Sequence, residues 1–375
     1  MPQPILFAIP RLDAGGPDRV IYELLCGLPR DRFSPHLLVS RRGGRYFDAL
    51  PADVVLHSLD SDVRYPVRAF AAAVDCIEPA LVMTTLRMNV AGGLARYFQK
   101  RRVPLVARQA NAIAADFAIL KSGSLVKHRV AELVVRHALR RADAVVAQSV
   151  DMGAELQKEL AHRQRLDVIG NPISITEISV KASSQTGAAI VVSGSPAIVS
   201  VGRLMAQKGY DLLLTAFARV LAAHPDARLT LLGEGPDRAA LEVQAAALGI
   251  DHAVAMPGQS DAVFAELAAA DLFVSSSRYE GFSNAILEAM ALEVPVAATD
   301  CPGATREMII DGETGMLTAA ITQESIADAM LRALGADRAA LGKAGQAHVA
   351  AQFDKAAIIG RYADLFDELI AAAQA

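Results

Sequence analysis

The stretch DLFVSSSRYEGFSNAILEAMALEVPVAATD, residues 271–300, indicates how this chain folds. Two short, mainly apolar runs, 271–277 and 295–300, are separated by a loop and by a strongly helical segment at 284–292. Short runs that are apolar on both faces and alternate with helices are typical of a parallel sheet buried on both sides. We therefore predict a strand–helix–strand unit, with the loop 278–283 at the carboxyl end of its first strand.

The same alternation extends through most of the chain. In the first part, strands are predicted at 5–10, 36–40, 54–59, 80–85, 104–108 and 143–149, with helices at 18–28, 66–77, 89–101 and 124–141. In the second part, further strands are predicted at 197–204, 228–233 and 253–258, with helices at 209–223, 237–248, 261–269, 322–334, 337–350 and 355–374. A Ser-, Gly- and Ala-rich segment at 181–196, between the two parts, is predicted to be a linker or a surface hairpin.

Two α/β domains, each a doubly wound parallel sheet, follow from this pattern. A chain of 375 residues is long for one core. We place the first domain at 1–175 and the second at 176–354, with the C-terminal helix 355–375 packing back on the first. Ligands of such sheets bind beyond the carboxyl ends of the strands, so the crevice between the two domains is the expected active site.

Composition excludes several classes of protein. With 53% hydrophobic and 21% charged residues, the chain is expected to fold rather than to be disordered. The apolar run 5–10 is too short for a membrane span or a signal peptide, so a cytoplasmic protein is expected. Its three cysteines, Cys26, Cys76 and Cys301, have no metal-ligand spacing and are interpreted as reduced thiols, with no structural zinc.

Charge is distributed unevenly along the chain. Residues 1–170 contain 24 basic and 17 acidic residues, whereas residues 171–375 contain 13 basic and 24 acidic ones. Such a division indicates two domains with different partners. A basic half can face phosphates, nucleic acid or an anionic membrane.

Two loops that follow predicted strands have residues suited to anions. In RLDAGGPDRV (11–20), Gly15 and Gly16 let backbone N–H groups approach a diphosphate or a sugar hydroxyl, and Asp18 can cap the next helix. A tight strand-to-helix turn explains the same glycines, and the pattern is not GxGxxG. In SVGRLMAQKGYD (200–211), Arg203 and Lys208 can converge on one anion, or can be ordinary surface charges.

The loop within the opening stretch is the third candidate. Ser283 or Asn284 is a suitable N-cap for the helix that follows, and the N–H groups there would accept a phosphate. Glu280 lies in the loop, whereas Glu288 lies in a helix that is apolar on nearly every face. Such a helix is buried, and a carboxylate in it needs a partner, which sugar hydroxyls would provide. The alternative is that both glutamates are surface charges.

Taken together, these motifs resemble the retaining glycosyltransferases of family 4. They are E-x7-E at 280–288 after a Ser-rich strand, GR-x4-KG at 202–209, Gly15-Gly16 after the first strand, GNPI at 170–173 and CPGATREMIIDGETGMLT at 301–318. The resemblance covers nearly the whole chain and is strongest to members that build bacterial surface polysaccharides. It implies the GT-B fold, in which two Rossmann-like domains face each other across a cleft.

The resemblance also implies roles for individual residues. Glu288 would hold the ribose of a nucleotide-sugar donor, Glu280 the transferred sugar, and Arg203 and Lys208 the diphosphate, so Glu280, Arg203 and Lys208 form the expected catalytic set. Backbone groups expected to bind sugar and phosphate belong to Gly15, Gly16, Gly281, Phe282, Ser283 and Asn284.

The implied reaction transfers the sugar to an acceptor hydroxyl on one face of the ring, with the leaving diphosphate assisting deprotonation. UDP is the commonest nucleotide of the family, with GDP as an alternative, and neither a metal nor a cofactor is expected. No DxD pair lies in a fitting loop, because the nearest, Asp60-Ser61-Asp62, is interpreted as a surface loop.

One feature departs from the family. Many members carry a histidine in the loop after the fifth strand, but ARQANAIAADF (107–117) has none. Arg108, Asn111 or Asp116 can take its place at the acceptor or the sugar, and the general base stays open.

A basic stripe in the first half indicates a membrane surface. On helix 124–141, Arg129, Arg136 and Arg140 fall within about 40° of one another. Apolar residues flank them, and Lys100-Arg101-Arg102 lies in the same half. We therefore expect attachment to the inner face of the cell membrane and a glycan or lipid-linked acceptor. A solvated helix face is the alternative.

Three other functions compete with glycosyl transfer. A nucleotide-sugar epimerase on the same fold would need acid and base residues in the cleft. A non-catalytic nucleotide-sugar binding protein would not need both glutamates and both cations. A nucleic-acid binder is not expected, because only 5% of residues are aromatic and no recognised nucleic-acid module is present. The sequence leaves open the sugar, the acceptor, the linkage and the oligomeric state.

Overall fold

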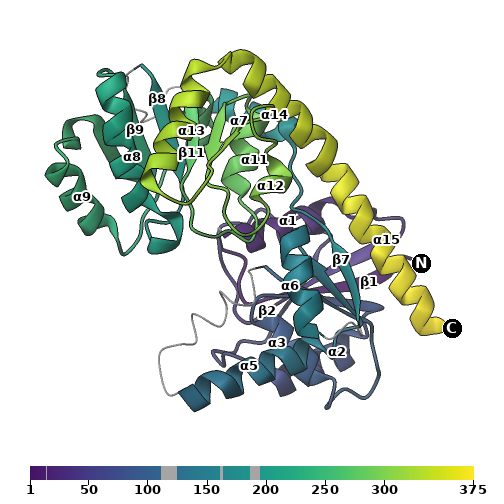
Figure 1. Cartoon of the computed structure of the whole chain (residues 1–375). Coiled ribbons are helices and arrows are strands. Elements are labelled where there is room, and N and C mark those ends of the chain that lie inside the picture. The colour runs from purple at the N-terminus through teal and green to yellow at the C-terminus, as the bar shows by residue number, and fades with distance from the viewer. Residues whose placement is uncertain (14, 111–124, 161–163, 186–194) are drawn as a thin grey trace. The chain divides into compact units, whose positions relative to one another are not determined.

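The structure is a computed structural model of the chain, and it describes residues 1–13, 15–110, 125–160, 164–185 and 195–375 (Figure 1). It divides into two compact units. Unit 1 comprises Met1–Pro172 together with Lys355–Ala375, and unit 2 comprises Ile173–Asp354. Each unit contains one sheet in which all neighbouring strands are parallel.

Unit 1 has a seven-stranded sheet in the order β3-β2-β1-β4-β5-β6-β7. Its strands are β1 Gln3–Ile9, β2 Phe33–Val39, β3 Val55–Ser58, β4 Leu81–Thr85, β5 Leu105–Arg108, β6 Ala144–Ala147 and β7 Arg165–Val168. Its helices are α1 Gly16–Gly27, α2 Val67–Ile77, α3 Met88–Ala95, α5 Leu125–Leu139, α6 Val150–Leu160 and α15 Lys355–Gln374.

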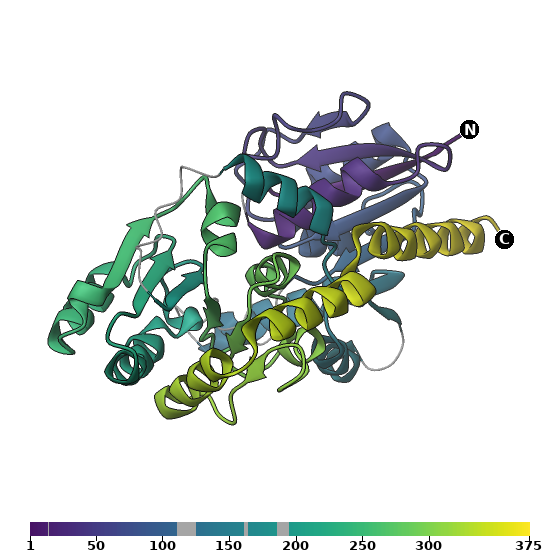
Figure 2. The ribbon, with the colours of Figure 1, turned by 90° about the horizontal axis from the view of Figure 1, so that it is seen from above.

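The central strand β1 explains why its sequence is apolar throughout. Ile5, Phe7 and Ile9 belong to a core shared with α1 and α15, whereas Leu6 and Ala8 belong to a core shared with α2 and α3. Successive side chains of a strand point to opposite faces, so a sheet covered by helices on both faces needs apolar residues at every position. Helices α1 and α15 lie side by side against one face (Figure 2).

Helix α15 is fastened to unit 1 by aromatic packing and by one buried arginine. The ring of Phe366 meets those of Phe7 and Phe33 edge-on, each at 6.1 Å between centroids. Arg108, fully buried at the end of β5, donates to Tyr362 Oη at 3.2 Å and to Asn171 Oδ1 at 2.7 Å. The last helix of the chain therefore completes the core built by the first 172 residues.

Unit 2 has a six-stranded sheet in the order β10-β9-β8-β11-β12-β13. Its strands are β8 Ala197–Val201, β9 Arg228–Leu232, β10 Val254–Gly258, β11 Leu272–Ser275, β12 Val296–Ala298 and β13 Met316–Leu317. Its helices are α7 Ile175–Ser184, α8 Tyr210–Ala223, α9 Arg238–Ala247, α10 Val263–Ala268, α11 Asn284–Ala291, α12 Thr305–Met308, α13 Gln323–Gly335 and α14 Arg338–Phe353, with short 3₁₀ turns η1 Ala206–Lys208 and η2 Asp251–Ala253.

The segment predicted as a linker or hairpin is helical at its start, which corrects that prediction. Residues 181–184 form the last turn of α7. Ser183 Oγ donates to the Ser179 carbonyl at 3.0 Å and Ser184 Oγ to the Lys181 carbonyl at 2.9 Å. Serine side chains that bond back to the preceding turn are compatible with a helix, so a Ser-rich composition alone did not mark a loop. Residues 186–194 lie outside the described part of the chain.

Each sheet reverses its strand order at one point. In unit 1, β1 lies between β2 and β4, and in unit 2, β8 lies between β9 and β11. Ligands of doubly wound folds bind in the crevice beyond the carboxyl ends of the two strands at such a point. In unit 2 the loops there are those after β8 and β11, which contain the residues singled out above.

Candidate functional site

A lysine and a glutamate meet where the loops after β8 and β11 come together. Lys208 Nζ lies 2.5 Å from Glu280 Oε1, and Ser277 Oγ donates to the same oxygen at 2.6 Å. The Glu280 side chain is only 7% exposed and that of Lys208 20%. A carboxylate this deeply buried needs a charged partner, and Lys208 provides it. The sequence singled out both residues but did not predict that they pair.

Further bonds hold the two loops against each other. Arg278 N–H donates to the Gln207 carbonyl at 2.7 Å, and Ser276 Oγ donates to the Lys208 carbonyl at 2.8 Å. The Arg278 guanidinium also holds both carboxylate oxygens of Asp211, at 2.8 and 2.6 Å. Bidentate pairs of this kind have a well-defined geometry. The bonds at Gln207, at the Lys208 carbonyl and at Asp211 together hold the backbone of Lys208 in place.

Two glycines permit this close approach. Gly209 has φ +62°, and a Cβ there would lie 2.1 Å from the Ser276 carbonyl oxygen. Gly303 has φ +125°, and a Cβ there would lie 1.8 Å from the Glu280 carbonyl oxygen. Only glycine adopts this backbone conformation readily and fits where there is no room for a Cβ atom. Because Glu280 N–H also donates to the Pro302 carbonyl at 3.0 Å, the loop after β12 packs directly on the loop of Glu280.

Glu288 lies in the second turn of α11, as the sequence predicted. It is buried at 9% exposure, between the buried side chains of Leu287 and Ala289. The prediction that this helix is buried is therefore confirmed. The helix begins after Ser283, whose backbone is extended and whose side chain makes no capping hydrogen bond. The ring of Phe282 meets that of Phe353 edge-on at 5.5 Å, within unit 2.

Sequence reasoning missed the loop 233–237, which follows β9. Leu204 N–H donates to the Glu234 carbonyl at 3.0 Å, and Asp237 N–H donates to the Leu204 carbonyl at 3.1 Å. These bonds fix the backbone next to the exposed Arg203, because Arg203 directly precedes Leu204. The signal was present in the Gly-Glu-Gly-Pro-Asp motif at the end of a predicted strand.

Burial keeps two nearby acids protonated. Burial raises the pKa of Tyr210, which directly follows Gly209. Burial also raises the pKa of the Cys301 thiol, and the Glu280 carboxylate adds to that effect. A thiol with a raised pKa is a poor nucleophile. Neither side chain is therefore a nucleophile, and the charged pair that the loops bring together is Lys208 with Glu280.

In unit 1, the glycine loop after β1 forms the start of α1. Gly15 is the N-cap and Gly16 the first helical residue, and Gly15 N–H donates to Asp18 Oδ2 at 2.8 Å. The predicted capping role of Asp18 is confirmed. Burial raises the pKa of this carboxyl. Arg108 is fully buried and bonded within unit 1, so it does not offer the exposed side chain expected of an acceptor contact. Asn111 and Asp116 lie outside the described residues.

Arg129 and Arg136 on α5 and Arg140 directly after it differ from one another, which corrects the picture of a uniform basic stripe. Arg136 Nε lies 2.5 Å from Glu159 Oε2, and its Nη1 lies 3.3 Å from Glu132 Oε2. Arg129 and Arg140 are exposed. Arg140 donates to the Glu159 carbonyl at 3.0 Å. Two glutamates thus neutralise the middle arginine, which a helical wheel of one element does not reveal.

Neither a metal cluster nor a membrane helix is found in the described part of the chain. There, no three His, Cys, Asp or Glu side chains gather in a way that would hold a metal ion. Within those residues, no helix combines the length and apolar character that crossing a bilayer requires. Independence from metals stays a prediction.

Two family descriptions match different parts of the chain. Residues 14–177 match "Glycosyltransferase Family 4", and residues 195–336 match "Glycosyl transferases group 1". Among curated relatives, the lipopolysaccharide core biosynthesis glycosyltransferase LpsE of Rhizobium meliloti is 30% identical over 230 residues, which are 60% of this chain and 64% of LpsE. D-inositol 3-phosphate glycosyltransferase of Nocardia farcinica is 30% identical over 260 residues, 66% of this chain and 57% of that protein. The chain thus spans less than two thirds of the length of these relatives.

Solved structures share the fold over nearly the full length. HepE of Anabaena, in complex with UDP-glucose, has a TM-score of 0.76 at 22% identity, covering 98% of this chain and 100% of that one. Sucrose-phosphate synthase of Thermosynechococcus elongatus has a TM-score of 0.80 at 21% identity, covering 99% of this chain and 100% of that one. At such identities the likeness establishes the fold, and the predicted GT-B class is confirmed.

Proposed function

Because this chain belongs to glycosyltransferase family 4, a family of retaining GT-B enzymes, we propose that it moves a sugar from a nucleotide-diphosphate sugar to a hydroxyl of a glycan or lipid-linked acceptor. The observation that carries this proposal is the Lys208–Glu280 pair at the strand-order reversal of unit 2. A fixed cation at the carboxyl edge of a parallel sheet suits a diphosphate.

We propose that unit 2 binds the donor and unit 1 the acceptor. In unit 2, Glu288 holds the ribose, while Arg203 and Lys208 hold the diphosphate beside the backbone N–H groups at the start of α11. Glu280 contacts hydroxyls of the transferred sugar. In unit 1, the backbone at Gly15 and Gly16 approaches the sugar and the diphosphate, and Asn111 remains a candidate contact to the acceptor.

In the proposed reaction, the acceptor hydroxyl attacks the anomeric carbon on the face from which the diphosphate leaves. The bond from the anomeric carbon to the phosphate oxygen breaks, a bond to the acceptor oxygen forms, and the hydroxyl proton passes to the leaving phosphate. Arg203 and Lys208 stabilise the negative charge that develops on the leaving group. No metal and no cofactor is required by this scheme, because the two cations and the helix start carry that charge.

The proposed donor is a UDP-sugar, and the proposed setting is bacterial cell-envelope polysaccharide, lipopolysaccharide or glycolipid synthesis. HepE of Anabaena, which shares this fold, binds UDP-glucose in its crystal structure. LpsE of Rhizobium meliloti, a relative in sequence, is a glycosyltransferase of lipopolysaccharide core biosynthesis. These likenesses support the class of donor and acceptor.

Thermal unfolding with a panel of nucleotide sugars tests the donor site. UDP-glucose, other UDP-sugars and GDP-mannose are compared, since a ligand that binds the folded state raises the unfolding temperature. Glu288→Ala and Lys208→Ala are expected to abolish the rise caused by the best donor. The matched controls Glu242→Ala and Lys343→Ala, at exposed positions of α9 and α14, should retain it. Each variant is compared with its own unliganded baseline. Shifts that survive both site substitutions would refute the assignment.

Product analysis separates the transferase from its rivals. An epimerase would convert the nucleotide sugar without releasing the nucleotide, and a binding protein would leave it intact. We expect release of UDP that depends on an added acceptor, with the anomeric configuration of the donor kept in the product. Release of no UDP with any glycan or lipid-linked acceptor, despite a clear thermal shift, would favour the binding protein.

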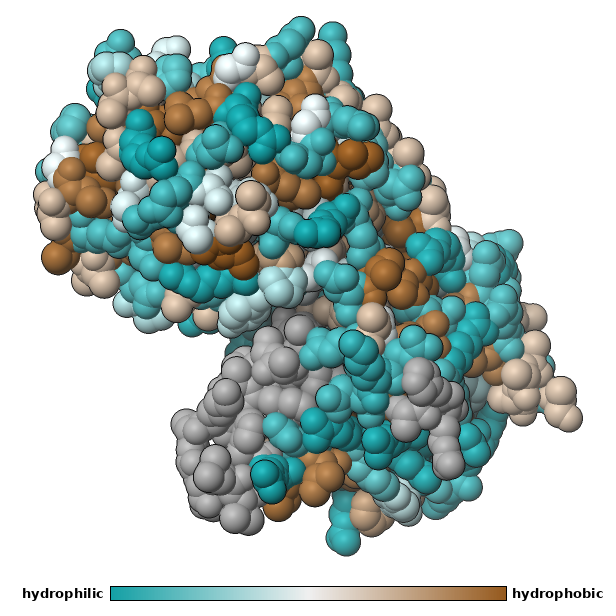
Figure 3. All heavy atoms as spheres, viewed as in Figure 1, coloured by the Kyte–Doolittle hydropathy of each residue, from teal (hydrophilic) through white to brown (hydrophobic). Residues whose placement is uncertain are grey.

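We also propose that α5 attaches the protein to an anionic membrane surface. Arg129 and Arg140 are exposed, and so are the apolar side chains of Val130, Leu133 and Val134. Figure 3 shows brown apolar spheres among teal polar ones in the region of this helix. A helix with exposed apolar residues and flanking arginines suits the boundary between lipid headgroups and acyl chains.

Sedimentation with liposomes tests this attachment. Wild-type protein should sediment with phosphatidylglycerol liposomes at low salt and not with phosphatidylcholine liposomes. The double variant Arg129→Glu/Arg140→Glu should stay in the supernatant. Arg136 is left unchanged because it is paired with two glutamates. Equal sedimentation of the variant would contradict the proposed role of α5.

A further inference from the structure

A strongly basic cavity of about 520 Å³ lies in unit 1, apart from the residues discussed for the donor. Six of its ten lining residues are arginine or lysine, and one is acidic. The basic residues are Arg96, Lys100, Arg101, Arg102, Arg140 and Arg141, and the acidic one is Asp143. Its volume is within the range of small-molecule sites.

The cavity lies at the amino edge of the sheet. Residues 96–102 end two residues short of β5, residues 140–143 directly precede β6, and Gln164 directly precedes β7. In parallel sheets the ligands of the main site bind at the carboxyl ends of the strands, which is where the loop of Gly15 lies in unit 1. This cavity is therefore at the opposite edge of the same sheet.

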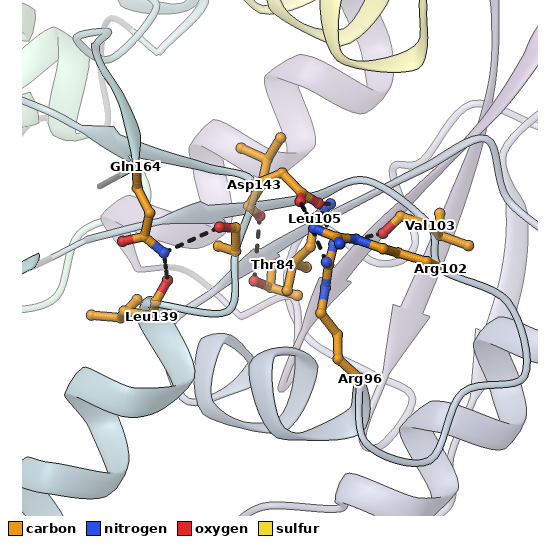
Figure 4. Close-up of polar contacts among 10 residues, drawn as sticks. Thr84, Arg96, Arg102, Val103, Leu105, Leu139, Asp143 and Gln164 are labelled. Atoms are coloured by element: carbon orange, nitrogen blue, oxygen red, sulfur yellow. Dashed lines mark hydrogen bonds and ion pairs between the residues drawn. The ribbon is translucent and has the colours of Figure 1, made fainter. Parts of the chain in front are cut away.

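Part of the cluster is structural. Asp143 accepts from Leu105 N–H at 2.8 Å and from Arg102 at 2.9 Å, and it also pairs with Arg96 (Figure 4). Burial opposes ionisation of Asp143, but Leu105 N–H and the two guanidinium groups hold its pKa below the ordinary value. Arg96 donates in addition to the Val103 carbonyl at 2.7 Å. These bonds join the starts of β5 and β6 and form a fixed wall of the cavity.

Gln164 also lines the cavity and fixes the backbone around it. Its amide donates to the Leu139 carbonyl at 2.8 Å and to the Ala142 carbonyl at 3.1 Å (Figure 4). These bonds hold the end of α5 and the turn that contains Arg140 and Arg141. The basic side chains therefore project from a backbone that is held on both sides.

Among the described residues the other cations form no ion pair, although the Asp75 carboxylate accepts from the Lys100 backbone N–H at 3.1 Å. Lys100 and Arg101 are exposed and form no ion pair within that part of the chain. The Arg141 guanidinium lies 4.6 Å from the centre of the Tyr97 ring, and Arg140 bonds to a backbone carbonyl. The carboxylate of Asp143 is thus shared by two arginines, while the remaining cations line the same cavity without an ion pair among the described residues. Like charges gathered in a concave site attract a multivalent anion.

We propose that this basic cavity binds an anion that carries phosphate groups, independently of the sugar donor. Arginine forks match phosphate oxygens in geometry, and lysine adds a mobile charge. The phosphate can belong to a soluble polyanion or to the headgroup of an anionic lipid. Tyr97 and Phe98, exposed at 56% and 51%, precede Lys100 and would contact the acyl region in the second case.

Calorimetric titration of the full chain with tripolyphosphate tests the soluble source. Binding should weaken at least tenfold in the double variant Arg101→Glu/Arg141→Glu and at high salt. Lys208→Ala should leave binding at the cavity unchanged, and any second binding event that this variant removes belongs to the donor site. Arg42→Glu, an exposed charge reversal after β2, is the matched control and should also bind normally.

Flotation with phosphatidylglycerol vesicles tests the lipid source. Loss of flotation in the double variant, with the arginines of α5 intact, would support a lipid headgroup. If charge reversal impairs folding, the titration and the flotation are both repeated with the milder variant Arg101→Gln/Arg141→Gln. The proposal is overturned if these variants match the wild type in both arms, or if the wild type binds neither tripolyphosphate nor the vesicles.

Discussion

The ammonium group of Lys208 lies 2.5 Å from Glu280 Oε1, although the two residues are 72 positions apart in the chain. They meet because β8 and β11 are neighbours in the sheet, and the loops after these strands emerge side by side. The pair holds a cation at the edge of unit 2 beside a side chain that is only 7% exposed. It is a preformed arrangement, bonded within the protein itself.

Removing the lysine should destabilise unit 2. Lys208→Ala leaves the Glu280 carboxylate buried with Ser277 Oγ as its remaining side-chain partner. Breaking a buried pair by removing one member costs several kcal/mol, and because Lys208 is partly exposed we expect about 2–4 kcal/mol. Chemical denaturation measures this loss.

A double-mutant cycle with Glu280→Gln provides the control. The glutamine has no charge to neutralise, so Lys208→Ala should cost much less in that background, with a coupling energy of about 1–3 kcal/mol. Additive losses would show that the two side chains do not stabilise each other.

Gly209 should be far less tolerant of substitution than another glycine with similar backbone angles. Gly209 and Gly249 have φ +62° and +70°, but a Cβ at Gly209 would lie 2.1 Å from a carbonyl oxygen, whereas nothing lies within 4 Å at Gly249. Gly249→Ala should cost about 1 kcal/mol, from backbone conformation alone. Gly209→Ala should cost at least about 2 kcal/mol more, because the loops after β8 and β11 must separate. Equal losses in denaturation would contradict this account.

Ser283 should contribute little to the stability of its helix. It occupies the N-cap of α11 without a side-chain capping bond, whereas Asp337 at the N-cap of α14 accepts from Ala340 N–H at 3.1 Å. A capping side chain contributes about 1 kcal/mol. We therefore expect Asp337→Ala to lower the free energy of unfolding by about 1 kcal/mol and Ser283→Ala by less than about 0.5 kcal/mol. A large loss for Ser283→Ala would reveal a structural role for that hydroxyl.

Acidification should weaken unit 1 through two stacked histidines. His36 Nδ1 lies 3.0 Å from His57 Nε2, and the rings are within 7° of parallel. Burial lowers the pKa of both rings below the ordinary value of 6.5, and the charge of His57 adds to the effect on His36. Below that value the unfolded chain binds more protons than the folded one. The contribution of the two histidines to the free energy of unfolding is therefore fully present above about pH 6.5 and is lost as the pH falls below it.

Unfolding temperatures at pH 7.5 and 5.5 measure this effect. The fall on acidification should be smaller in His57→Gln than in the wild type, because one titrating ring is gone and the other loses its charged neighbour. His252→Gln, on the 3₁₀ turn η2 of unit 2, is the control and should keep the full fall. An unchanged fall in His57→Gln would assign the acid sensitivity to other groups.

Local sequence patterns were sufficient to predict the strands that are covered by helices on both faces of the sheet. β1 and β6 are apolar at nearly every position and β4 is buried throughout because helices cover both faces, and the approximate positions of these strands followed from the sequence. β7 was missed because its sequence, Arg-Leu-Asp-Val, alternates charged and apolar residues at the edge of the sheet, where it pairs with β6 alone. The two-residue strand β13 is too short to leave a pattern.

The candidate site was predictable in its parts. Glycines, cations and glutamates stood in loops after predicted strands, and the carboxyl ends of parallel strands share one edge. Pairing was not predictable, because the loops of Lys208 and Glu280 become neighbours only through the strand order β9-β8-β11. The ion pair of Arg136 with Glu159 was likewise not predictable, because Glu159 belongs to a different helix and meets Arg136 only in the folded chain.

The sequence by itself determined the class of fold, the burial of Glu288 and the residue types offered at each strand end, because these depend on neighbours along the chain. Only the tertiary structure decided which of those residues meet. Arg108, a predicted contact to the acceptor or the sugar, bonds to Tyr362 across 254 positions and thereby joins the end of β5 to the last helix. Contacts at such separation follow from strand order and helix packing, which no local pattern of residues encodes.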